Sequence, residues 1–283
     1  MPAELAPPRA VTDAWDDVPM ATVEALFRYP VKGFTPEALK QLVVQSDGRV
    51  EGDRVLAFRF ADAVDPEDDA GLEYWPKKRG LALMDMPSLA RLRLEYDRST
   101  RRLRISDAGT VLVEAGLDPD GRAEIEDAVT RAVAAGPDAR RLRGEGRLPL
   151  TLIGDGVTSR FQDRARGYIS LHGSASVAEL DKAADPTVDH RRFRSNIVVS
   201  GLPAWSEVGW DGVVRIGELR FTIAAPIRRC AAIMANPDDG TRDVNLLRVL
   251  TDRFDQEAPT LGILLLPVGG GGTIRVGDPV DRE

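Results

Sequence analysis

The sequence predicts a mainly β fold of the α+β type: a β-barrel with a smaller N-terminal β-rich domain and a few peripheral helices. Three observations support this prediction. Short apolar stretches with two-residue alternation recur along the chain, helical periodicity is confined to a few segments, and strands do not alternate regularly with helices. A doubly wound sheet needs that regular alternation, so a barrel is the better interpretation.

The first part of the chain predicts strands, one short helical turn and one helix. Residues 1–19 are rich in charge and proline, so we expect a disordered leader, with Met20 as an alternative start. A helical turn is expected near Pro87, and the spacing of apolar residues in 121–136, before a Gly-Pro pair, predicts a helix. Alternation predicts the strands 22–29, 54–60, 92–96 and 103–105, the last two as a hairpin.

A charged, non-periodic stretch at 137–148 is interpreted as a linker between an N-terminal domain, 20–136, and a C-terminal domain, 149–283. In the second domain we expect Ser174 to cap a helix over 175–184, and a second helix to contain 246–250. Apolar patterning predicts strands at 149–154, 168–172, 197–199, 213–216, 219–223, 231–234, 262–268 and 273–278.

Charge and hydropathy restrict the class of ligand. The 283 residues carry a formal net charge of -7, which argues against a general nucleic-acid binder. Basic clusters at 140–147, 160–166 and 190–194 suit a small anionic ligand, although a solvated face is the alternative for each of them. The longest apolar run, 261–268, is too short to cross a bilayer, so we expect a cytoplasmic protein without a membrane partner.

Cys230 is the only cysteine, and Arg228 and Arg229 stand directly before it. Nearby positive charge stabilises a thiolate, which makes Cys230 a candidate nucleophile or soft-metal ligand. The alternative is a small buried apolar residue. With His172 and His190 as the only histidines, a structural zinc site is not expected, so a metal would have to arrive within a cofactor.

Two other motifs have simpler interpretations. The four glycines at 269–272 lack the Lys-Ser/Thr of a phosphate-binding loop, so we expect the tip of a hairpin. The acidic pair before Gly240 is typical of a turn. A hydrolase with Cys230 as nucleophile and His172 as base is possible by inventory, but no nucleophile-elbow pattern surrounds the cysteine.

Five segments, in order, resemble the MOSC family and its N-terminal barrel companion. Each of them matches a landmark of the family pattern, from about residue 21 to residue 280. They are Tyr29-Pro-Val-Lys-Gly33, Gly52-Asp-Arg-Val-Leu-Ala-Phe58, Phe193-Arg-Ser-Asn-Ile-Val-Val-Ser-Gly201, Arg229-Cys230 followed by Asn236-Pro-Asp-Asp-Gly240, and Ile274-Arg-Val-Gly-Asp278.

The resemblance implies a molybdenum cofactor, Mo-molybdopterin, whose metal is ligated by Cys230, the expected catalytic residue. It also implies an oxidoreductase, similar to the amidoxime-reducing components, that reduces N-hydroxylated small molecules with electrons from a separate donor protein. Convergent Lys and Arg suit a ligand that carries a phosphate and a dithiolene. The cofactor-binding residues expected on this basis are Lys32, Gly33, Arg54, His172, Gly173, Arg194, Asn196, Arg228 and Arg229.

Several positions depart from the family pattern. Gly33 replaces a serine, and Gly173 stands where relatives often have a hydroxyl residue, so a backbone N–H would have to replace a hydroxyl contact to phosphate. His172 is expected either to line the pocket or to be a structural histidine. Two alternative functions remain: a sulfur or cofactor carrier with a persulfide on Cys230, and a metal-free scaffold in a specialised biosynthetic pathway.

Overall fold

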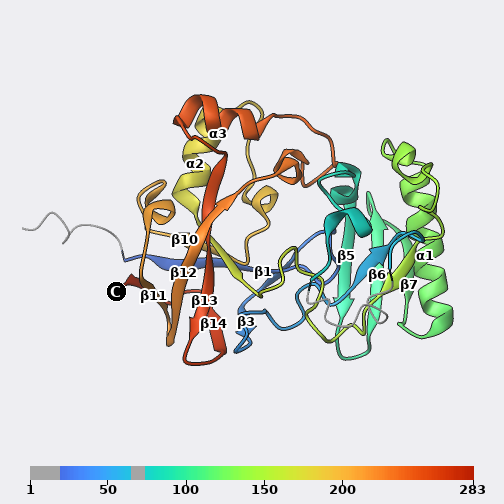
Figure 1. The fold of residues 1–283 in the computed structure, drawn as a ribbon, viewed down its shortest axis with the longest axis horizontal. Helices are drawn as coiled ribbons and strands as arrows, with labels where there is room; N and C mark the ends of the chain where they lie inside the picture. The colour runs from blue at the N-terminus through green and yellow to red at the C-terminus, as the bar shows by residue number, and fades with distance from the viewer. Residues whose placement is uncertain (1–19, 65–73) are drawn as a thin grey trace, which may run out of the picture.

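The structure, a computed structural model, describes residues 20–64 and 74–283 (Figure 1). Strands make up 33% of the chain and helices 23%, which confirms the mainly β prediction. The expected leader, 1–19, lies outside the described residues. Within the described part of the chain, no helix is both long and apolar enough to cross a membrane.

The largest element is an eight-stranded sheet that curls into a barrel. Its strand order is β15-β11-β12-β13-β9-β10-β1-β2. The barrel closes between the segment leading into β15 and β1, because Val23 N donates to Asp278 O at 2.9 Å and Val280 N donates to Ala21 O at 2.8 Å. The strands are β1 (Thr22–Arg28), β2 (Glu37–Leu39), β9 (Ile169–Gly173), β10 (Ile197–Ser200), β11 (Val213–Ile216), β12 (Leu219–Arg228), β13 (Thr260–Val268) and β15 (Val280–Arg282).

Apolar side chains from alternate positions fill the barrel, as a two-residue period requires. Leu171, Val199, Phe221 and Ile263 are fully buried there. A separate antiparallel pair, β3 (Gln41–Val44) with β14 (Gly272–Arg275), contributes further side chains to the same core. The barrel is therefore a packed core, and a ligand has to bind outside it.

A second lobe lies beside the barrel, at the right of Figure 1. Helix α1 (Pro119–Ala134) packs against an antiparallel sheet of β5 (Leu92–Asp97), β6 (Arg102–Asp107) and β7 (Thr110–Ala115). Asp118 caps α1 by accepting a hydrogen bond from Gly121 N at 3.1 Å. The expected hairpin and helix are both present, and Pro87 begins a 3₁₀ helix as predicted.

The chain passes between the lobes more than once. β1 and β2, from the first part of the sequence, belong to the barrel, whereas β8 (Thr151–Ile153) pairs with β4 (Ala57–Arg59). Helices α2 (Ser174–Ala183) and α3 (Leu246–Phe254) pack together over the upper part of the barrel in Figure 1. Each lobe thus contains strands from both halves of the sequence, and strand pairing ties these halves together.

Three local predictions were wrong. Residues Ala231–Met234 form a 3₁₀ helix instead of a strand, because the chain turns after Cys230 and Ile233 N donates back to Cys230 O at 3.2 Å. Ser174 is the first residue of α2, and Gly173 occupies the cap position without a side-chain bond. The glycine run does not join a hairpin, because the strand after it pairs with β3 instead of β13.

Candidate functional site

A cavity of about 360 Å³, lined by residues of both lobes, contains most of the predicted site. Its volume lies at the lower end of the range for small-molecule sites, ~300–1,000 Å³. Eight of the ten predicted site residues line it: Lys32, Gly33, Arg54, Arg194, Asn196, Arg228, Arg229 and Cys230. The fold therefore brings together segments that lie up to two hundred residues apart in the sequence.

Strand β12 delivers Cys230 to the cavity wall. The strand changes register between Pro226 and Arg228, and Cys230 follows as the first residue of the turn into the 3₁₀ helix. Bulges of this kind bend a strand end and redirect its side chains. The thiol is partly exposed, and Lys77 Nζ lies 3.6 Å from Cys230 Sγ. The small-buried-residue alternative therefore does not describe Cys230.

Two partly buried guanidinium groups flank the cavity and contact carbonyl oxygens. Arg229 donates to Leu261 O at 2.7 Å and to Phe193 O at 2.8 Å, and Arg194 donates to Phe34 O at 2.7 Å. Within residues 20–64 and 74–283, neither has a carboxylate at ion-pair distance. Burial lowers the pKa of Arg229 to about 10 even though Cys230 opposes the shift, and burial also lowers the pKa of Arg194. Each arginine is therefore a cation that lacks an ionic partner among the described residues.

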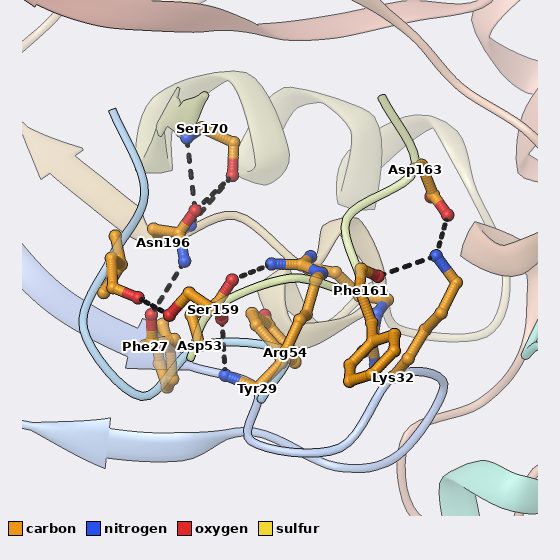
Figure 2. A network of polar contacts seen from close by, with 12 residues as sticks. Phe27, Tyr29, Lys32, Asp53, Arg54, Ser159, Phe161, Asp163, Ser170 and Asn196 are labelled. Carbon is orange, nitrogen blue, oxygen red and sulfur yellow. Dashed lines mark hydrogen bonds and ion pairs between the residues drawn. The ribbon is translucent and has the colours of Figure 1, made fainter. Parts of the chain in front are cut away.

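Tyr29 positions a second arginine beside Arg194. The guanidinium carbons of Arg194 and Arg54 lie 4.2 and 5.2 Å from the centre of its ring. Asp53 holds Arg54 through an ion pair and accepts a hydrogen bond from Tyr29 N at 2.8 Å, as Figure 2 shows. Arg54 and Arg194 both have left-handed backbones, with φ of 52° and 53°, a conformation that non-glycine residues adopt rarely and that clusters at functional sites.

Lys32 and Lys77 meet at one carboxylate. Lys32 Nζ donates to Phe161 O at 3.0 Å and forms an ion pair with Asp163, while Lys77 Nζ lies 3.1 Å from the other oxygen of that carboxylate. Burial lowers the pKa of Lys32 to about 8, although Asp163 opposes the shift. Burial alone would raise the pKa of Asp163, but Lys32 and Lys77 outweigh it and hold this pKa well below its usual range.

Positive charge dominates the cavity wall. Among the described residues that line it, Asp163 is the only acidic one. Nine basic residues line the same cavity: Lys32, Arg54, Lys77, Arg164, Arg166, Arg192, Arg194, Arg228 and Arg229. Such an excess of like charge in one cavity favours a ligand with several negative groups.

Asn196 lines the cavity, but its side chain binds neighbouring strands. Its Oδ1 accepts from Ser170 Oγ at 3.0 Å, and its Nδ2 donates to Phe27 O at 3.2 Å (Figure 2). These bonds link β1 and β9 to the start of β10, two residues after Arg194. The side chain of Asn196 is therefore engaged in holding these strands together.

His172 and Gly173 do not line the cavity, contrary to the expectation that they bind the cofactor. His172 is 1% exposed and packs 5.8 Å from the ring of Phe193, and burial followed by Arg229 lowers its pKa well below 6.5, so it is neutral. Gly173 N donates to Glu207 Oε1 at 3.0 Å, so this N–H is not available to a phosphate. A hydrolase with His172 as the base also loses its support, because the imidazole is enclosed behind the wall.

Sequence reasoning missed several residues of the wall. Arg164 and Arg166 belong to the basic cluster noted at 160–166, where Asp163 is the single acid. Lys77 had a further signal, because the chain contains only five lysines, and two of them meet at Asp163. Among the described residues, no group of three or more His, Cys, Asp or Glu is placed to hold a metal ion.

Two family models match the chain at the positions of these structural features. The MOSC N-terminal beta barrel domain matches residues 20–139, and the MOSC domain matches residues 159–281. The second match includes Cys230 and Arg194, and the first includes Lys32 and Arg54.

Curated relatives resemble parts of the chain. Mitochondrial amidoxime-reducing component 1 of Danio rerio is 30% identical over 160 residues, covering 54% of this chain and 47% of that protein. Mitochondrial amidoxime reducing component 2 of Rattus norvegicus is 32% identical over 124 residues, covering 40% and 36%. Molybdenum cofactor sulfurase of Homo sapiens is 36% identical over 127 residues, covering 41% and 14%. Each match spans less than half of the relative's length. The two family models together cover most of residues 20–281. On that basis the chain belongs to the MOSC family, as a MOSC domain preceded by a MOSC N-terminal β-barrel domain.

Proposed function

We propose that this protein is a molybdenum-cofactor-binding oxidoreductase that reduces N-hydroxylated or related N-oxygenated small molecules, with electrons from a separate redox protein. One observation carries the proposal: the thiol of Cys230 opens into a cavity whose wall has nine basic residues and one acidic residue. The names of the relatives, amidoxime-reducing components and molybdenum cofactor sulfurases, support the same ligand class.

The residues present suit a pterin cofactor with a phosphate and a dithiolene. The test of fit is the pair of partly buried arginines, Arg194 and Arg229, whose charges no carboxylate among the described residues balances. Leaving a charge away from water without an ionic partner is unfavourable, so an anionic ligand would restore the balance. A soft thiolate ligand, Cys230, suits a metal bound by sulfur.

Each residue has a proposed task. Cys230 would ligate the metal, and Arg229, directly before it, would stabilise the thiolate by Coulomb attraction. Lys32, Arg54 and Arg194 would bind the phosphate and other oxyanions through charge-assisted hydrogen bonds, which are among the stronger ones in proteins. When bound, the cofactor supplies the oxygen-atom and electron-transfer chemistry, while the chain supplies orientation and charge.

Lys77 has a task that the family pattern did not indicate. Its ammonium lies within 3.6 Å of Cys230 Sγ and contacts Asp163, so it donates a hydrogen bond beside the proposed metal ligand. Lys77 comes shortly before β5 of the second lobe, whereas Cys230 follows β12 of the barrel, so the site is complete only when both lobes are in place. The substrate would enter over the exposed rim that includes Arg228.

The direct test is reduction of an aromatic amidoxime by the purified protein, produced in a host that makes the cofactor, with reduced methyl viologen as electron donor. Conversion to the amidine, abolished in Cys230→Ala, would support the proposal. Absence of turnover in protein that contains stoichiometric molybdenum would overturn the reaction class.

Metal and sulfur analysis of the same preparation separates the alternatives. Stoichiometric molybdenum supports the oxidoreductase. Cyanide-labile sulfur on Cys230 without molybdenum would favour the carrier function instead. Protein with neither would favour the metal-free scaffold.

A further inference from the structure

Asp163 is the one acidic residue among the described residues of the cavity wall, and both of its oxygens are engaged. One accepts from Lys32 Nζ, and the other lies 3.1 Å from Lys77 Nζ. Lys77 in turn reaches Cys230 Sγ at 3.6 Å. A carboxylate thus occupies the position between two lysines where an oxyanion of a ligand would bind.

We propose that Asp163 is a displaceable counter-ion: it neutralises Lys32 and Lys77 until an oxyanion of the ligand takes its place. This inference rests on the proposed anionic ligand of the cavity and adds how that ligand gains access to the two lysines. Asp163 then makes the site selective, because only an anion that binds the two lysines more strongly than the carboxylate does can displace it.

The exposures of the two partners differ in the way that displacement requires. The side chain of Asp163 is 46% exposed, whereas that of Lys32 is 6% exposed. Lys32 is fixed further by Phe161 O at 3.0 Å. The acid can move into solvent at little cost in hydration, and the lysine cannot follow it. Figure 2 shows Asp163 reaching Lys32 from a separate segment of chain.

The segment that carries Asp163 has no regular secondary structure. Residues 154–168, between β8 and β9, form only bends and irregular backbone. No strand ladder or helix has to break for the carboxylate to turn outward. The backbone is held on both sides of the pair, because Lys32 N donates to Leu56 O at 2.9 Å and Trp75 N donates to Gln162 O at 2.9 Å. Displacement therefore needs only a rotation of the half-exposed Asp163 side chain away from buried Lys32.

Coulomb repulsion supplies the reason for displacement. An oxyanion bonded to both ammonium groups would share them with a carboxylate a few ångströms away, and like charges at that distance repel appreciably even after screening. Turning Asp163 outward removes this repulsion and leaves the cavity wall with basic residues alone. The ligand then replaces the carboxylate as the ionic partner of buried Lys32.

The test is a calorimetric titration of Asp163→Asn with inorganic phosphate at constant ionic strength. We expect phosphate to bind about tenfold tighter than to the unaltered protein, a difference of ~1.4 kcal/mol. Asp127→Asn is the matched control, because it removes the same charge from an exposed site on α1. The control should bind as the unaltered protein does.

A structural role for Asp163 predicts the opposite sign. If Asp163 only held the lysines in place, the asparagine variant would bind phosphate equally or more weakly, and that result would overturn the inference. Absence of phosphate binding in both proteins would also overturn it. These outcomes do not depend on molybdenum. If the purified protein lacks molybdenum but Asp163→Asn still binds phosphate more tightly than the unaltered protein does, the proposed function is refuted and the inference about Asp163 stands.

A second measurement uses the unaltered protein, in case the variant does not fold. Amide hydrogen exchange of residues 160–167 should become faster when phosphate binds, because Asp163 releases its two lysines. Ligand binding ordinarily protects the segments around a site, so slower exchange in this segment would contradict displacement.

Discussion

Replacing Arg194 by Met should separate ligand binding from stability. The side chain contributes one charged hydrogen bond to Phe34 O and a contact with the Tyr29 ring, worth ~1.5–3 and ~0.5–1 kcal/mol respectively. Removing the charge also removes its desolvation cost, which amounts to several kcal/mol in real proteins. Because these contributions oppose each other, we expect the free energy of unfolding to change by about 1 kcal/mol or less.

Phosphate affinity should respond much more strongly. An oxyanion loses a charge-assisted hydrogen bond in the Arg194→Met variant, at ~1.5–3 kcal/mol, which corresponds to roughly tenfold to one-hundredfold weaker binding. Urea unfolding measures the stability change, and calorimetric titration with inorganic phosphate measures the affinity. Molybdenum content after purification provides a third readout, which should fall with the affinity.

Arg192 lies in the same segment and also lines the cavity, so it serves as a comparison for a basic side chain that already has an ionic partner. It is 2% exposed, but its charge is balanced by Asp243, with Nη2 2.6 Å from the carboxylate. Arg192→Met leaves that carboxylate without its ionic partner and should cost ~3 kcal/mol of stability. It should weaken phosphate binding less than Arg194→Met does, because Asp243 already balances the charge of Arg192. Equal loss of affinity in both variants, or a larger stability loss for Arg194→Met, would refute the assignment of Arg194 to the ligand.

Three further outcomes are expected. Cys230→Ala should keep the thermal unfolding midpoint within a few degrees, since the thiol is partly exposed, but should lose molybdenum and amidoxime reduction; an active variant would contradict the ligand role. Phosphate affinity should fall as pH rises through about 8, where buried Lys32 loses its proton, and Lys32→Met should remove this pH dependence. The unfolded chain keeps this proton up to about 10.5, so the contribution of Lys32 to stability rises with pH between those values. Leu171→Ala, at a fully buried barrel position, should cost ~2–5 kcal/mol in urea unfolding without weakening phosphate binding per folded molecule.

The barrel could be predicted from local pattern because alternation is a property of each strand. Val213–Ile216 alternates between buried and exposed positions at its end, and residues 197–199 are all apolar; both segments are strands. Closure could not be predicted, because it depends on bonds from Val23 and Val280 to partners more than two hundred residues away. Ala231–Met234 is apolar enough for a strand, but the chain turns after Cys230 into a 3₁₀ helix, in which Ile233 N donates back to Cys230 O at 3.2 Å.

The site was predicted where charge and motif agreed. Arg194 and Cys230 combine a family pattern with a chemical reason, and both line the cavity. Asp163 and Lys77 carry no motif, and their importance arises from a contact between segments far apart in the sequence, which sequence spacing does not encode. Gly173 had a plausible backbone donor, but buried Glu207 accepts that hydrogen bond.

The central claim is that a single sulfur, held among guanidinium and ammonium groups, binds the metal of an anionic cofactor. X-ray absorption at the molybdenum edge tests it most directly, by comparing the purified protein with Cys230→Ser. We predict that the variant, if it retains metal, shows one sulfur neighbour fewer around molybdenum. An identical sulfur shell in both proteins, or purified protein without molybdenum from a cofactor-producing host, would contradict the claim.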